Sequence, residues 1–178
     1  MTEYLKHQEI IDKCERLNQN YQVDPAFFDN IIEELLDSDM DTDSVILNGF
    51  KRLLSEVDHE IERMEDYAGM KASCFKGCAF CCYFPIIVTQ MENFPEERKE
   101  KIYQHWDSYF DEHQVKLDTA LNMDLQDSET KLNYKRLDLP CPMLDPETKT
   151  CMAYEIRPIP CRTYLNYANP KVCAENHM

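Results

Sequence analysis

The feature that most constrains this chain is the crowding of cysteine in the stretch CFKGCAFCC, residues 74–82. Four of these nine residues are cysteines, and two of them are adjacent. Thiolates that are held close together repel one another, so they stay protonated or become oxidised unless a cation neutralises them. The stretch therefore predicts a metal site. Four more cysteines follow, and the complete predicted ligand set is Cys74, Cys78, Cys81, Cys82, Cys141, Cys151, Cys161 and Cys173.

Whether these cysteines bind a metal or form disulfides depends on the redox state of the cell compartment in which the protein lies. The first residues mix charged and apolar side chains and lack the apolar run of a secretory signal. No segment approaches the roughly 20 apolar residues that span a bilayer. We therefore expect a cytoplasmic protein that is not in a membrane. Since the cytoplasm keeps thiols reduced, nine cysteines there favour metal or redox chemistry over a disulfide framework.

All-thiolate ligation suits zinc and iron–sulfur clusters alike. Eight thiols can form two four-thiolate sites, or one site with additional thiols beside it. Adjacent cysteines rarely bind one ion at good angles, so we expect Cys81 and Cys82 to have different roles or to face different metals. The residues predict a metal protein, with zinc or an iron–sulfur cluster of the [4Fe–4S] type as the cofactor.

The charge of the chain excludes some partners. There are 34 acidic residues against 19 basic ones, which gives a formal net charge of −15. Such a surface repels phosphate backbones and anionic lipid headgroups. We therefore expect no nucleic acid and no membrane among the partners, while a protein partner stays open.

A mainly α-helical fold is expected, because the chain has only 3 glycines and its first seventy residues carry apolar side chains at helical spacing. We divide the chain into a helical region, residues 1–70, and a cysteine-rich metal-binding domain, residues 71–178, packed as one unit. The second part is irregular and has at most short strands. The lone Cys14 is interpreted as a small buried side chain of the first helix.

Several element boundaries follow from capping residues. Asp24 followed by Pro25 predicts a helix start, and Asp43 or Ser44 is the expected cap of a long helix that ends near Gly69. Residues 83–90 predict a short strand or a buried extended segment. Thr89 with Glu92 fits a capping box that leads into a helix or a broken helix pair over residues 95–121.

Further along, residues 124–138 are expected to form a loop, and LDPETKT predicts a turn between two short extended pieces. For residues 74–82, two structures stay open. A helix would place the four sulfurs within an arc of roughly 100°, whereas a loop would let backbone amides point at them.

These motifs resemble the YkgJ-type cysteine-cluster family, whose members are described as zinc- or iron-chelating and often as iron–sulfur proteins. The resemblance rests on CFKGCAFCC, on CPMLD from Cys141, on CMAYEIRPIPCRTY from Cys151, and on the last cysteine, Cys173. It covers about residues 74–174 and leaves residues 1–70 outside. It implies metal binding and names no reaction, so whether the chain is an enzyme stays open.

Two arginines complete the candidate site. Arg157 and Arg162 lie near Cys161 in the sequence, and their charge can offset that of a thiolate cluster or pair with Glu155. Pro142 and Pro160 restrict the backbone beside the cysteines. We therefore assign Arg157 and Arg162 to cofactor binding.

Three enzyme classes compete with a simple metal protein. The spacing of Cys74, Cys78 and Cys81 also fits radical S-adenosylmethionine enzymes, but the strand–helix alternation of their barrel is absent from the sequence. Flagellin-type lysine N-methylases carry a similar cysteine region in longer chains. A thiol redox protein would use Cys78 and Cys81, yet no thioredoxin-like pattern surrounds them.

Overall fold

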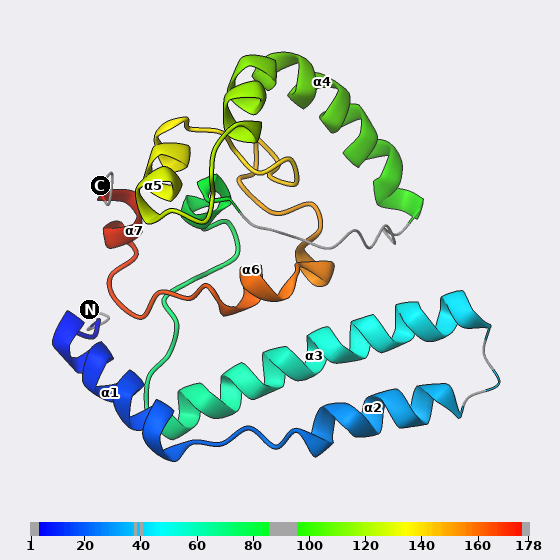
Figure 1. Ribbon diagram of the computed structural model, residues 1–178, viewed down its shortest axis with the longest axis vertical. Helices are drawn as coiled ribbons and strands as arrows, with labels where there is room; N and C mark the ends of the chain where they lie inside the picture. Colours follow the sequence, from blue (N-terminus) through cyan, green and yellow to red (C-terminus); the bar gives the residue numbers. More distant parts are fainter. Residues whose placement is uncertain (1–3, 38, 40, 86–95, 176–178) are drawn as a thin grey trace. The chain divides into compact units, whose positions relative to one another are not determined.

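The computed structural model describes residues 4–37, 39, 41–85 and 96–175 (Figure 1). Within these residues the chain forms seven α-helices and two short 3₁₀ helices. The β structure in this part of the chain is one isolated antiparallel bridge between Leu144 and Cys151. The predicted mainly α-helical fold class is confirmed. Among the described helices, none combines the length and the apolar character needed to cross a membrane.

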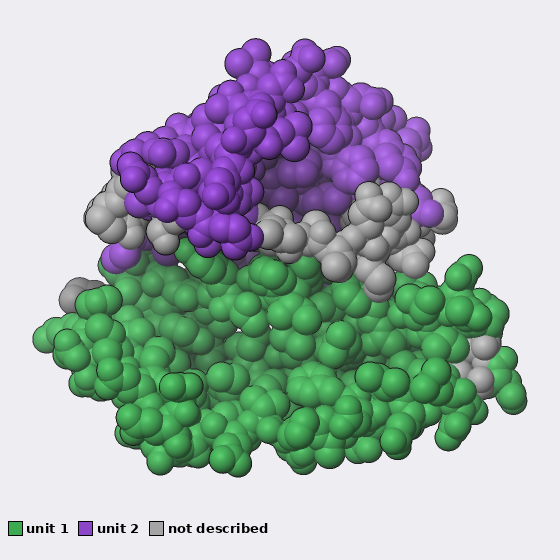
Figure 2. Space-filling view, in the orientation of Figure 1, with its two compact units in different colours: residues 1–74, 156–170 green, residues 75–155, 171–178 purple. Residues whose placement is uncertain are grey.

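The chain divides into two compact units, coloured separately in Figure 2. Unit 1 comprises residues 1–74 and 156–170, and unit 2 comprises residues 75–155 and 171–178. The chain therefore leaves unit 1, builds most of unit 2, and returns before its last helix. The division predicted at residue 70 concerns sequence regions and stays a prediction.

Unit 1 is built on two antiparallel helices, which lie side by side in Figure 1. α2 (Ala26–Leu36) packs on α3 (Thr42–Ala68), and the buried side chains between them include Ile31, Leu35 and Leu54. α1 (His7–Asn20) and the short α6 (Ile159–Thr163) also pack on α3. The apolar stripes read from the sequence thus face a common core.

The ends of α3 show how local chemistry sets its length. At the start, the carboxylate of Asp41 accepts the Ser44 amide, so the N-cap is Asp41 and the predicted caps Asp43 and Ser44 are wrong. At the end, Gly69 adopts φ 60°, a left-handed conformation that suits glycine, as predicted. Lys13 of α1 donates to the carbonyls of Ala68 and Gly69 and neutralises the negative end of the helix dipole.

Two details of the first helices differ from expectation. Pro25 is the N-cap of α2, so the helix begins one residue later than predicted, and the carboxylate of Asp24 accepts the Ala26 amide. Cys14 is exposed and not buried, which corrects the prediction of a core residue. It lies on α1, which has no fully buried side chain, so a helical apolar stripe there did not imply full burial.

Unit 2 surrounds a smaller core. Its helices are the 3₁₀ helix η1 (Phe80–Tyr83), α4 (Glu96–Leu121), α5 (Ser128–Arg136) and α7 (Lys171–Glu175), while the 3₁₀ helix η2 (Tyr154–Ile156) lies where the chain returns to unit 1. Ile102 and Tyr109 of α4 are buried, as are Leu139 and Leu144. α4 is a single continuous helix from Glu96 onward. The segment 86–90 of the predicted strand, and the capping box Thr89–Glu92, lie outside the described residues.

The predicted loop over residues 124–138 is wrong, because most of it forms α5. The carboxylate of Asp127 accepts the Thr130 amide at 2.7 Å and caps the helix. Lys135 and Arg136 occupy the last turn, where cations favour the helix dipole. The polar composition of this segment therefore belongs to a short helix that is stabilised by a capping carboxylate at its start and by cations in its last turn.

This cap generates a prediction. Asp127→Ala removes the acceptor of the Thr130 amide and should lower the free energy of unfolding by about 1 kcal/mol. Asp127→Asn keeps a capping oxygen and should retain most of the stability. Urea unfolding followed by circular dichroism measures both variants, and equal losses for alanine and asparagine would contradict the capping role.

Candidate metal centre

The adjacent cysteines of unit 2 lie on η1. A turn precedes it, in which the Cys78 amide donates to the Phe75 carbonyl at 2.9 Å and Gly77 adopts φ 96°. This positive φ strains any residue other than glycine, so Gly77 allows the chain to turn sharply between Cys74 and Cys78. The Cys82 amide then donates to the Ala79 carbonyl at 3.0 Å. Residues 74–82 are therefore a turn followed by a 3₁₀ helix, and not an α-helix.

Cys141 is tied directly to this helix. Its amide donates to the Cys82 carbonyl at 2.7 Å, which joins two segments about sixty residues apart in sequence. Two side chains of α4 hold the same segment: the Tyr109 hydroxyl donates to the Pro140 carbonyl at 2.5 Å, and the Trp106 indole donates to the Pro142 carbonyl at 3.0 Å. The carbonyls on both sides of Cys141 are thus fixed by the helix that covers them.

Cys151 lies opposite, across a hairpin. The Leu144–Cys151 bridge and the bond from the Met152 amide to the Met143 carbonyl, at 2.8 Å, pair the two arms. Asp145 closes the turn between them, because its carboxylate accepts the amides of Glu147 and Thr148. The turn predicted at LDPETKT is confirmed, whereas the two extended pieces expected beside it are reduced to the single Leu144–Cys151 bridge. Cys141 and Cys151 consequently stand on the two arms of one hairpin.

Four thiols influence one another electrostatically. The pKa of Cys82 is raised first by its hydrogen bond with Cys81, then by burial, and further by the charges of Cys81, Cys141 and Cys151. The pKa of Cys141 is raised to about 11, chiefly by burial, while the Met143 amide, which donates to its sulfur, opposes the rise. Without a cation Cys82 and Cys141 stay protonated at neutral pH, and a bound metal would reverse that balance.

Two more cysteines belong to unit 2. Cys78 directly precedes η1, and Cys173 lies on α7, which packs against η1. All nine cysteines of the chain, each of them described, are thiols and not disulfides. Among the described residues, however, no three Cys, His, Asp or Glu side chains are already arranged to hold a metal ion. Binding would require the thiols to approach one another further.

The remaining predicted ligands, Cys74 and Cys161, belong to unit 1. The sulfur of Cys74 is exposed and accepts the Asn166 amide at 3.4 Å. Cys161 is partly buried on α6, and its amide donates to the Pro158 carbonyl at 2.9 Å. Their membership in the ligand set, like the set as a whole, stays a prediction.

The two arginines also belong to unit 1. Arg162 is buried, donates to the Arg157 carbonyl at 2.8 Å, and forms an ion pair with Asp58. This pair attaches α6 to α3 and gives Arg162 a structural role. The assignment of Arg157 and Arg162 to cofactor binding stays a prediction.

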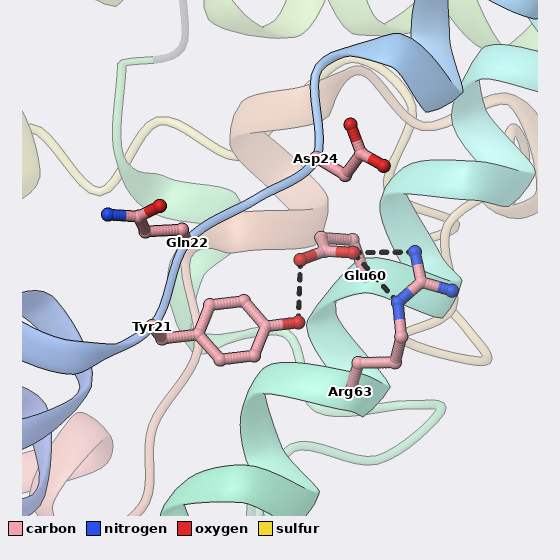
Figure 3. A pocket seen from close by; sticks show the side chains of 5 residues that line it. All are labelled: Tyr21, Gln22, Asp24, Glu60 and Arg63. Carbon is pink, nitrogen blue, oxygen red and sulfur yellow. Dashed lines mark hydrogen bonds and ion pairs between the residues drawn. The ribbon is translucent and has the colours of Figure 1, made fainter.

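One surface pocket of about 280 Å³ lies elsewhere in unit 1 (Figure 3). Its lining includes Tyr21 and Glu60, whose hydroxyl and carboxylate are hydrogen-bonded at 2.8 Å, and Arg63, which pairs with the same carboxylate. Tyr21, Glu60 and Arg63 thus satisfy one another through these bonds.

Sequence reasoning missed the groups that support the thiols. The amide of Met143, two residues after Cys141, donates to its sulfur, and the spacing within CPMLD is the signal that could have found it. Nothing in the sequence indicated that Trp106 and Tyr109 bond the carbonyls beside Cys141.

A family model named CxxCxxCC, described as "Putative zinc- or iron-chelating domain", matches residues 73–177. The match covers more than half of the chain and includes every cysteine except Cys14. No curated protein and no solved structure gives a significant match.

The Tyr109 bond generates a prediction about the segment that carries Cys141. Tyr109→Phe removes a buried hydroxyl and leaves the Pro140 carbonyl without this donor, so the free energy of unfolding should fall by about 1–2 kcal/mol. Tyr103→Phe is the matched control, because Tyr103 is half exposed on the same helix. Urea unfolding should separate the two variants, and an equal effect would contradict the anchoring role.

The turn of the hairpin generates a prediction on pH. Lys101, whose ammonium bonds Asp145 at 2.8 Å, and the amides of Thr148 and Glu147 lower the pKa of this carboxyl. A lowered pKa in the folded state stabilises the protein above the pKa of the unfolded chain, about 3.9, and this contribution is lost as the pH falls below it.

Asp145→Asn should therefore reduce the free energy of unfolding by about 1–3 kcal/mol at pH 7, and the difference from wild type should shrink below about pH 4. Asp118→Asn, an exposed carboxylate of the same unit, should change little. Denaturant unfolding across this pH range measures both. A difference that stays constant with pH would mean that the charge of Asp145 is not what stabilises the turn.

Proposed function

Because the chain belongs to the CxxCxxCC family of zinc- or iron-chelating domains, we propose that the thiols of unit 2 hold an iron–sulfur cluster. The observation that carries the proposal is that a backbone bond places Cys141 beside the adjacent cysteines Cys81 and Cys82, while the Leu144–Cys151 bridge brings Cys151 back to the same segment. These four cysteines come from two sequence regions that the bond between the Cys141 amide and the Cys82 carbonyl brings together.

The donor set fits such a group chemically. All four donors are sulfur, which suits zinc and iron–sulfur clusters, and Cys141 is partly buried, which limits competing water. The adjacent pair favours the cluster over a single zinc ion. A tetrahedral ion would need both neighbouring thiolates at good angles, whereas a cluster with several irons offers each thiolate a different iron.

The protein would contribute orientation and charge stabilisation. The Met143 amide favours the thiolate form of Cys141, and Pro142 places no second amide beside it. Trp106 and Tyr109 hold the backbone on both sides, so the thiol is presented from a rigid segment. When bound, a cluster would supply electron transfer or structural support. Cys78 and Cys173 are the further candidates for ligation within the unit.

Metal analysis tests the proposal. The full chain purified without oxygen should be brown and contain matching amounts of iron and acid-labile sulfide. A colourless protein with stoichiometric zinc and no sulfide would contradict the cluster, although it would still agree with the family description. A protein that binds neither metal would contradict chelation altogether.

Cysteine variants locate the ligands. Cys82→Ser and Cys141→Ser should each lower the metal content and the visible absorption, because each removes one thiolate. Cys14→Ser is the matched control, since Cys14 is an exposed thiol of unit 1 outside the family match. If all three variants retained the same metal content, the proposed centre would be wrong.

Three enzyme classes stay predictions: a methylase-related enzyme, a thiol redox protein and a radical S-adenosylmethionine enzyme. No described contact favours one of their reactions over another. The cytoplasmic location and the protein partner also stay predictions.

A further inference from the structure

The exposed side of α4 carries an apolar row. Tyr103 and Phe110 are each 50% exposed, and Leu121 is 83% exposed. Their separations of seven and eleven residues are close to whole helical turns, so the three side chains project from one side of the helix over roughly 27 Å. The buried side of α4, with Ile102 and Tyr109, packs into the core, so this row is a second apolar side that faces solvent.

An acidic row runs beside the apolar one. Asp107, Asp111 and Asp118 are exposed and lie roughly 40–80° around the helix from Tyr103. None of these three carboxylates takes part in a described salt bridge. Lys101 and Lys116 of the same helix are engaged elsewhere, with the Asp145 carboxylate and the Asp138 carbonyl. The exposed side of α4 therefore presents apolar contacts and negative charge in parallel.

We propose that this side of α4 docks a basic amphipathic helix of a partner protein. The apolar row matches the apolar stripe of such a helix, and the acidic row matches lysines or arginines along its flank. Charge argues against a second copy of the chain as the occupant, because each copy carries a net charge of −15 and the same acidic row. The proposal is independent of the metal centre.

The chain contains a reporter for this surface. Trp106 is its only tryptophan, and its ring packs edge-on against Tyr103 with the centroids 5.7 Å apart. A helix that covers Tyr103 would change the surroundings of Trp106. Because the chain has no other tryptophan, a change in its fluorescence reports on the proposed surface alone.

The experiment uses the full chain as purified and a fluorescently labelled 18-residue peptide without tryptophan. The peptide has leucines at helical spacing and lysines along one flank, and a scrambled peptide of equal composition is its control. Anisotropy should show saturable binding of the amphipathic peptide and much weaker binding of the scrambled one. Trp106 emission should change with the same concentration dependence, and added salt should weaken binding.

Two sets of variants test the surface. Asp107→Asn, Asp111→Asn and Asp118→Asn combined should weaken binding about tenfold, given the modest strength of exposed ion pairs. Asp29→Asn, Glu33→Gln and Asp37→Asn combined change the net charge equally on α2 and its C-cap, and should leave the affinity unchanged. Phe110→Ser should abolish most of the binding, and circular dichroism checks that it folds.

Several results would overturn the proposal. The scrambled peptide could bind as tightly as the amphipathic one, the two triple variants could weaken binding equally, or binding could leave Trp106 emission unchanged. Analytical ultracentrifugation tests the last possibility, a dimer. If the chain forms a dimer that Phe110→Ser dissociates, the occupant of this surface is a second copy and not a basic partner.

Discussion

The hydrogen bond from the Cys141 amide to the Cys82 carbonyl joins the two sequence regions on which the candidate centre depends. On one side of it, a 3₁₀ helix carries two adjacent thiols. On the other, a hairpin carries Cys141 and Cys151 on opposite arms. Sulfur side chains that would repel one another as thiolates are thereby collected by backbone bonds, which do not depend on thiol charge. A bound metal would draw these thiols closer together than the backbone bonds alone hold them.

α4 has two separate roles in unit 2. Its inner side buries Ile102 and Tyr109 and fixes the carbonyls of Pro140 and Pro142, so the helix supports the backbone around Cys141. Its outer side carries exposed apolar and acidic side chains in two parallel rows. A helix that is rigidly attached to the candidate centre on one side is well placed to present a docking surface on the other.

Much of the helical fold could be predicted, because periodic apolar residues and capping groups are local signals. Gly69 ends α3 as predicted, since a left-handed C-cap favours glycine. The failures also have local causes. α5 was missed because its composition is polar and its stability comes from Asp127 at one end and cations at the other. Cys14 is exposed because α1 packs on α3 without burying any side chain fully.

For the site, the amino-acid sequence alone determined the chemistry: eight clustered cysteines allow few functions other than binding a thiophilic metal, and the family match agrees with that reading. It could not determine which thiols are neighbours, because contacts between residues 82 and 141 depend on how distant segments fold together. The tertiary structure decided that Cys81, Cys82, Cys141 and Cys151 come together in one unit, where neighbouring thiols raise the pKa of Cys82 and Cys141, and that Arg162 pairs with Asp58. The reason is physical: donor type belongs to each residue, whereas proximity belongs to the fold.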